Sequence, residues 1–196
     1  MERYTAIVLS AKPVTLEIPG VRVHGRTQAL ASASDLHAAR LDALATVQTP
    51  LCFFLDDDDA LPADYLSVLG ECADRMRATG AALAYTDELV REPGKGDVRR
   101  CWYDYDSEAH RFAPMGLHHL VVMDTAVAQE VARTLPRGEF WTEHMLYWAM
   151  GRRGAAHIPR VGYVWNRSRA GFSRNPRMLA AQMRTQRWVV TQGALA

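Results

Sequence analysis

The sequence has few cysteines and no long hydrophobic segment. No apolar run approaches the roughly 18 residues that a membrane-spanning helix needs. The N-terminus also lacks the basic-then-apolar layout of a signal peptide. The three cysteines, Cys52, Cys72 and Cys101, are odd in number and show neither metal-ligand nor redox spacing. We therefore expect an intracellular protein without a membrane span, whose cysteines are reduced packing residues.

Acidic residues are absent from the C-terminal part of the chain. Residues 151–196 contain nine arginines and no aspartate or glutamate, so all 22 acidic side chains lie before them. Charge segregation of this kind favours an anionic partner near the C-terminal segment. The alternative is that these arginines pair with acidic side chains elsewhere in the same molecule.

The apolar pattern predicts alternating strands and helices. The runs YTAIVLS (residues 4–10) and LCFFL (residues 51–55) are continuous and apolar, as in strands covered on both faces. Shorter strands are expected at 21–24, 81–86, 118–123 and 158–165. Helices are expected at 34–47, 62–80, 124–135, 141–150 and 176–190. This alternation predicts a single-domain α/β sandwich with a largely parallel sheet.

Several boundaries follow from single residues. Ser34 and Asp35 are expected to cap the first helix, and Pro62 to occupy the first turn of the second. The strand at 81–86 is expected to end at Asp87 and Glu88.

Four consecutive aspartates, Asp56 to Asp59, follow the LCFFL strand directly. Adjacent carboxylates repel one another and raise one another's pKa values. A divalent cation relieves this repulsion, and carboxylate oxygens suit magnesium or manganese. Open α/β sheets bind ligands at the carboxyl ends of their strands. A solvated turn that caps the next helix is the alternative, but the flanking strand and helix favour a metal site.

These segments resemble family 2 glycosyltransferases. Residues 39–66 (ARLDALATVQTPLCFFLDDDDALPADYL) resemble that family's arginine-bearing helix, buried strand, DXD metal motif and proline-started helix. AYTDELV (84–90) resembles the next strand, and GLHHLVVMDTAVAQEVA (116–132) the strand and helix before the acceptor site. TEHML (142–146) resembles the Glu-Asp motif of the catalytic base, and HIPRVGYVWNRSRAGFS (157–173) the closing strand and lid.

The resemblance implies a GT-A fold, a Rossmann-like α/β/α sandwich. Residues 1–90 would form the nucleotide-sugar and metal half, residues 91–175 the acceptor half, and residues 176–196 a basic C-terminal helix. It also implies a metal-dependent, inverting transfer from a nucleotide-diphosphate sugar, with a UDP-sugar favoured and Mn²⁺ or Mg²⁺ as the cation. The compartment would be the cytoplasm of a bacterial or phage-infected cell.

Site residues follow from the same resemblance. The metal is assigned to Asp58 and Asp59. Glu143 is the expected catalytic base, with His144 as its rival. His118 and His119 fall in a predicted strand, so one should point inward and the other outward. Contacts to the donor are expected from Ser10, Arg40, Asp56, Asp57, Arg167 and Arg169, and contacts to the acceptor from Asp87, His118, His119 and Trp141.

The chain departs from the family pattern in two places. The region 12–27 is too short for a full helix and lacks the family's Asp-Asp-Gly-Ser turn, which implies a reduced or rebuilt nucleobase pocket. Glu143 lies between Thr142 and His144 rather than in an acidic pair. A non-catalytic module that binds nucleotide-sugar or nucleic acid is therefore the alternative to an enzyme.

The acceptor is left open between two classes. One is a saccharide of a cell-surface polymer. The other is a hydroxymethylated base in DNA, because compact relatives resemble phage-type enzymes and because basic residues alternate with aromatics in the C-terminal segment. Those aromatics are Tyr163, Trp165, Phe172 and Trp188.

Overall fold

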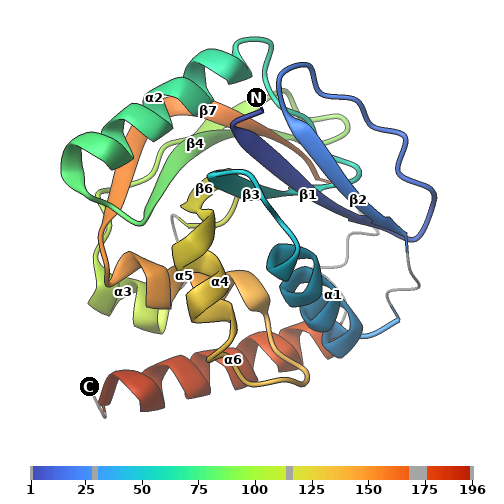
Figure 1. The fold of residues 1–196 in the computed structure, drawn as a ribbon. Helices are drawn as coiled ribbons and strands as arrows, with labels where there is room; N and C mark the ends of the chain where they lie inside the picture. Colours follow the sequence, from blue (N-terminus) through green and yellow to red (C-terminus); the bar gives the residue numbers. More distant parts are fainter. Residues whose placement is uncertain (1, 28–30, 114–116, 168–175, 195–196) are drawn as a thin grey trace.

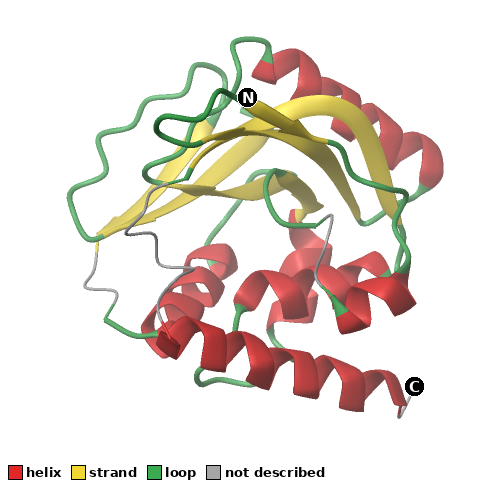
Figure 2. Ribbon diagram, turned by 180° about the vertical axis from the view of Figure 1, so that it is seen from behind, coloured by secondary structure: helices red, strands yellow, loops and turns green. Residues whose placement is uncertain are grey.

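The computed structural model describes residues 2–27, 31–113, 117–167 and 176–194. A twisted central sheet separates two helical layers (Figure 1). Among the described helices, α2 (Tyr65–Thr79) is the one that covers the first face. The other face carries α1 (Ala33–Ala45), α3 (Ser107–Phe112), α4 (Thr125–Ala132) and α5 (Thr142–Gly151). Helix α6 (Pro176–Ala194) runs along the outer side of that second layer, as Figure 2 shows from behind.

Within the described residues the sheet has seven strands, and six of them follow the order β2-β1-β3-β6-β4-β5. Strand β6 pairs with the start of β4 and β5 with its later part, whereas the seventh strand, β7, pairs along the whole of β4. The long pairings, β1 with β2, β1 with β3 and β4 with β7, are parallel. The short pairings made by β5 and β6 are antiparallel. The strands are β1 (Tyr4–Ser10), β2 (Arg22–Thr27), β3 (Leu51–Asp56), β4 (Leu83–Arg91), β5 (Val98–Arg100), β6 (Val121–Asp124) and β7 (Ala155–Asn166). The predicted α/β sandwich with a mostly parallel sheet is confirmed.

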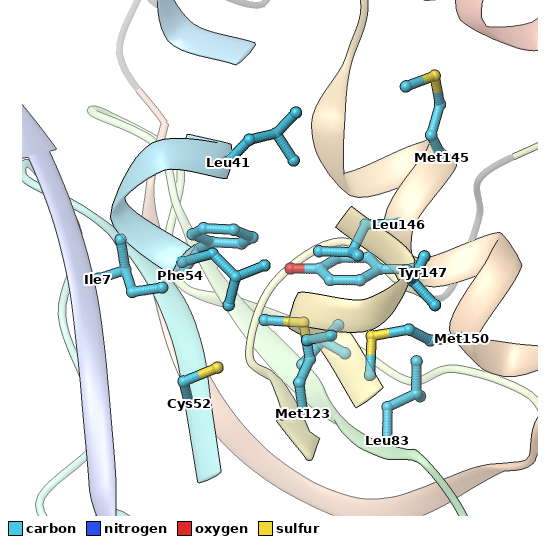
Figure 3. Close-up of a cluster of buried hydrophobic side chains, with 14 of the residues drawn as sticks. Ile7, Leu41, Cys52, Phe54, Leu83, Met123, Met145, Leu146, Tyr147 and Met150 are labelled. Carbon is cyan, nitrogen blue, oxygen red and sulfur yellow. The ribbon is translucent and has the colours of Figure 1, made fainter. Parts of the chain in front are cut away.

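Each face of the sheet has its own hydrophobic core. Strand β3 contributes Phe54 to the core under the helical layer and Phe53 to the core under α2. The first of these cores also contains Met123 and Tyr147 (Figure 3). Since successive side chains of a strand point to opposite faces, a strand buried on both faces is mostly apolar. This is why the two continuous apolar runs were recognisable as strands.

Strand β4 does not end at Asp87 and Glu88, as the sequence predicted, but continues through both to Arg91. The two carboxylates are nearly inaccessible, with 1% and 0% of their surface exposed. Arg99 lies 2.7 Å from Asp87, and Arg100 lies 3.3 Å from Glu88. Because each buried acid has a cationic partner, the strand tolerates charges that would otherwise end it.

Helices α1 and α2 also begin at other residues than the sequence predicted. Helix α1 is capped by Ser32, whose side chain accepts the N–H of Asp35 at 3.1 Å, rather than by Ser34 or Asp35. Helix α2 begins at Tyr65, after Pro62, because Ala60 is still extended and pairs with Val164 of β7. Residues 12–21 contain no helix, as expected, and connect β1 directly to its parallel neighbour β2. None of the helices within the described ranges is long and apolar enough to cross a membrane.

Candidate active site

A pocket of about 340 Å³ opens at the carboxyl ends of β1 and β3. Its floor and walls come from segments that are far apart in the sequence: the ends of β1, β3 and β7, the bend before β6, and helices α1, α5 and α6. Eleven of the predicted site residues line it, namely Ser10, Arg40, Asp56, Asp57, Asp58, Asp59, His118, His119, Trp141, Glu143 and Arg167.

The acidic segment, Asp56 to Asp59, is hydrogen-bonded to the end of β7. Asp59 accepts a hydrogen bond from the Tyr163 hydroxyl at 2.8 Å and another from the Asn166 backbone N–H at 2.7 Å. The Asn166 side-chain amide donates to the Asp58 carbonyl oxygen at 2.7 Å. Burial raises the pKa of Asp59 to about 6, and burial together with the charge of Asp56 raises the pKa of Asp58. The loop is therefore held in a shape that keeps its negative charges together.

Arg40 of α1 connects the acidic segment to α5. Its guanidinium lies 3.0 Å from Asp56, forms an ion pair with Glu143, and sits 5.4 Å from the centre of the Phe54 ring. Only 7% of Arg40 is exposed. The sequence predicted that Arg40 contacts a pyrophosphate, whereas here two carboxylates already engage its guanidinium.

Glu143 lies in the first turn of α5 and is 8% exposed. One of its oxygens is bound by Arg40, whereas Oε2 has no hydrogen-bond partner among the described residues. Burial raises the pKa of Glu143, and the positive charge of Arg40 opposes that rise. A carboxylate that lines a pocket and whose pKa is raised by burial is well suited to accept a proton.

Two histidines and two tryptophans form the remaining wall. His118 and His119 lie in a bend before β6 rather than in the strand, so both line the pocket and the predicted alternation does not apply. The His118 ring lies 5.7 Å from that of Trp141 and 5.8 Å from that of Trp165. Burial and the neighbouring positive charges lower the pKa of His118 well below its usual value, so this ring is neutral near pH 7.

Two predicted site residues lie outside the pocket, and a third lies outside the described residues. His144 is directed into the helical layer, where its Nε2 contacts the carbonyl oxygen of His110 at 3.1 Å, and burial lowers its pKa to about 4. Asp87 is enclosed by Arg99, His157 and the backbone N–H of Trp102. Arg169 belongs to the part of the chain that the structure does not describe.

Three supporting residues of the site, Glu88, Tyr163 and Asn166, were not assigned to it from the sequence. Glu88 contacts His119, whereas Tyr163 and Asn166 hold Asp59. The sequence placed Glu88 at a strand end and Tyr163 within a strand. Neither position reveals that β4 and β7 approach the acidic segment.

The side chains present fit a divalent cation. One ligand atom from each of Asp56, Asp59 and His119 can be chosen so that all three lie within 4.8 Å of one another. A second group meets the same criterion with Glu88, His118 and His119. Carboxylate oxygens and imidazole nitrogens are common ligands of divalent metals. Asp58, one of the two residues assigned to the metal from the sequence, belongs to neither group.

The layered fold matches that of GT-A-like glycosyltransferases. No known protein family and no curated protein matches the sequence. Among solved structures, TarS 1-349 from S. aureus in complex with UDP-GlcNAc matches 86% of this chain and 60% of that chain, with a TM-score of 0.59 and 12% identity.

Two further TarS structures agree. One of TarS 1-349 gives a TM-score of 0.57 at 11% identity, over 84% of this chain and 60% of that chain. A third structure, of TarS, gives a TM-score of 0.56 at 12% identity, over 85% of this chain and 37% of that chain. The chain thus spans 60% or less of the length of these TarS chains. At such low identity the likeness establishes the fold, whereas membership of family 2 stays a prediction.

Proposed function

We propose that this chain is a glycosyltransferase that transfers a sugar from a nucleotide-diphosphate donor, a UDP-sugar by preference, to an acceptor hydroxyl. The observation that carries the proposal is the buried carboxylate of Glu143 at the wall of the pocket that also contains the acidic segment. The fold likeness to TarS, of which one structure contains UDP-GlcNAc and another UDP, supports the choice of donor.

Glu143 would act as the general base of an inverting transfer. Its carboxylate takes the proton of the acceptor hydroxyl while the hydroxyl oxygen bonds to the anomeric carbon of the donor sugar. The bond from that carbon to the diphosphate breaks on the opposite side, and the nucleoside diphosphate leaves with the electron pair. Arg40 favours the ionised form of Glu143, which is the form that accepts a proton.

Other pocket residues would bind the donor. The acidic segment would hold Mn²⁺ or Mg²⁺, and a bound cation neutralises charge that develops on a diphosphate leaving group. Arg167 lines the pocket and would contact the same diphosphate, because its ion pair with Glu92 is long, at 3.8 Å. Ser10 and Asp57 line the pocket beside them and complete the proposed donor contacts.

A saccharide is the proposed acceptor. Trp141 and Trp165 line the pocket wall, and indole rings are suited to pack against the apolar face of a sugar ring. The DNA alternative depends on unpaired positive charge in the C-terminal segment. However, Arg153, Arg160 and Arg184 pair with acids of other segments at 2.5 to 3.0 Å. This pairing reduces the positive charge available to a nucleic acid.

The experiment is a donor and acceptor panel, read as nucleoside diphosphate released and as product mass. We expect turnover of a UDP-sugar with Mn²⁺ or Mg²⁺ and none in chelator. Glu143→Gln should lower turnover by about 10²- to 10⁴-fold, the usual contribution of a general base. Glu139→Gln, at an exposed ion pair with Arg184, is the matched control and should keep full activity.

Two outcomes would contradict the proposal. Binding of UDP or UDP-GlcNAc without turnover would identify the chain as a non-catalytic module. Full activity of Glu143→Gln would exclude Glu143 as the base.

A further inference from the structure

His119 is a potential metal ligand outside the acidic segment. It follows Asp59 by 60 positions in the sequence, yet it forms a compact group with Asp56 and Asp59 at the pocket. Only 8% of its surface is exposed. A nitrogen ligand here would change the chemistry of the site, because an all-carboxylate site suits Mg²⁺ and Ca²⁺, whereas imidazole favours transition metals.

Glu88 sets the tautomer of His119. The Nδ1 atom of His119 lies 2.5 Å from Oε2 of Glu88, which is completely buried. Since a carboxylate only accepts, Nδ1 carries the proton and Nε2 keeps its free lone pair. A histidine whose second nitrogen donates to a carboxylate is the usual arrangement of a metal-bound imidazole. Arg100, 3.3 Å from the other oxygen of Glu88, compensates the buried charge.

Tyr163 fixes all three side chains relative to one another. Its ring stacks on the His119 ring, with centroids 4.6 Å apart and planes 9° from parallel. Its hydroxyl donates to Asp59 at 2.8 Å and accepts the backbone N–H of Asp56 at 3.2 Å. Strand β7 therefore contributes one residue that contacts each of the three ligand residues. Such support keeps ligands in place before an ion binds.

Local charge decides between the two candidate groups that contain His119. The group of Glu88, His118 and His119 has one carboxylate, and Arg100 already pairs with it. The group of Asp56, Asp59 and His119 has two carboxylates, and although Arg40 pairs with Asp56, Asp59 has no cationic partner among the described ion pairs and the group lies beside Asp57 and Asp58. A divalent cation is attracted more strongly to the second group, which leaves Glu88 as a supporting residue.

We propose that His119 is the nitrogen ligand of a divalent cation whose oxygen ligands are Asp56 and Asp59. Glu88 and Tyr163 are the positioning residues of this site. The mixed nitrogen and oxygen ligands select Mn²⁺ over Mg²⁺ and Ca²⁺. The inference rests on the metal requirement of the proposed function, but it needs no sugar transfer and is tested on the nucleotide-free protein.

The test is Mn²⁺ binding followed by electron paramagnetic resonance, with Mg²⁺ as competitor. The wild-type complex should show coupling of Mn²⁺ to a ¹⁴N nucleus, and excess Mg²⁺ should displace Mn²⁺ poorly. His119→Gln should remove the nitrogen coupling and weaken Mn²⁺ binding by at least about 10-fold, and Glu88→Gln should weaken it by about 10- to 100-fold. His24→Gln, on β2, is the matched control and should bind like the wild type.

Several results would overturn the site. Wild-type protein that binds no Mn²⁺, or binds it without nitrogen coupling, would do so even if the variants failed to fold. An equal loss in His118→Gln would place the ion in the Glu88, His118 and His119 group instead. Nitrogen-coupled Mn²⁺ that depends on His119, in a protein without UDP-sugar turnover, would support the site and contradict the proposed function.

Discussion

Arg40→Met tests the buried ion network between α1, β3 and α5. Methionine keeps a flexible apolar side chain beside Phe54 but removes the guanidinium that pairs with Asp56 and Glu143. The two acids respond differently. The Asp56 side chain is 47% exposed and stays hydrated, whereas the Glu143 side chain is 11% exposed and loses its only described partner for Oε1.

The expected cost follows from the loss of charge compensation at Glu143. At an effective dielectric constant of about 20, opposite unit charges about 4 Å apart attract by about 4 kcal/mol. Measured losses on removing one partner of a buried pair are about 3–5 kcal/mol. We therefore expect the free energy of unfolding to fall by about 3–5 kcal/mol. For a domain of this size, the melting temperature would fall by roughly 6–20 °C.

The loss of stability in Arg40→Met should also increase with pH. Without Arg40, the pKa of Glu143 rises further above its value in the unfolded chain, because burial then acts unopposed. The folded variant therefore binds a proton that the unfolded chain releases. Its stability should fall as the pH rises through this interval, so the deficit relative to wild type should be larger at pH 8 than at pH 5.

Urea denaturation of both proteins at several pH values measures this effect. The control is Arg153→Met, which removes an ion pair with Glu130 in which both side chains are about half exposed. Exposed pairs of this kind contribute little to stability. The reasoning is refuted if Arg40→Met costs no more than the control, or if its deficit is the same at pH 5 and pH 8.

Two further predictions concern stability. Burial lowers the pKa of His144 to about 4, so the wild type should lose stability as the pH falls from about 6.5 to about 4. The amide of His144→Gln can still donate to the His110 carbonyl but does not titrate. In urea denaturation, this variant should therefore lose up to about 3 kcal/mol less stability than the wild type over that pH interval. Equal pH dependence of the two proteins would exclude His144 as the titrating group. Gly162→Ala should lower the free energy of unfolding by about 1–3 kcal/mol, because the added Cβ would lie 2.5 Å from the Thr86 hydroxyl oxygen and 2.6 Å from a Leu120 methyl group. Thermal melting measures this effect. An unchanged melting temperature would contradict the close packing around Gly162.

The parts of this fold that were predictable depend on consecutive residues. The strands β1 and β3 were recognisable because strands covered on both faces are apolar along most of their length. The position of the acidic segment after β3 was sufficient to predict a ligand site at that edge of the sheet. The helices were found from their apolar spacing, although the start of α2 was misplaced because Ala60 pairs with Val164, 104 positions away.

The roles of individual charges depend on contacts between distant segments. In the sequence, Arg40 is a helix arginine, Glu88 a strand-end acid and His119 one of two adjacent histidines. The fold places Arg40 between two acids, and Glu88 against His119. The sequence by itself determined the layered fold and the edge where the site lies, because apolar periodicity and strand ends are local properties. Only the tertiary structure decided which charges are paired and which remain free to react, because electrostatic partners are set by distance in space.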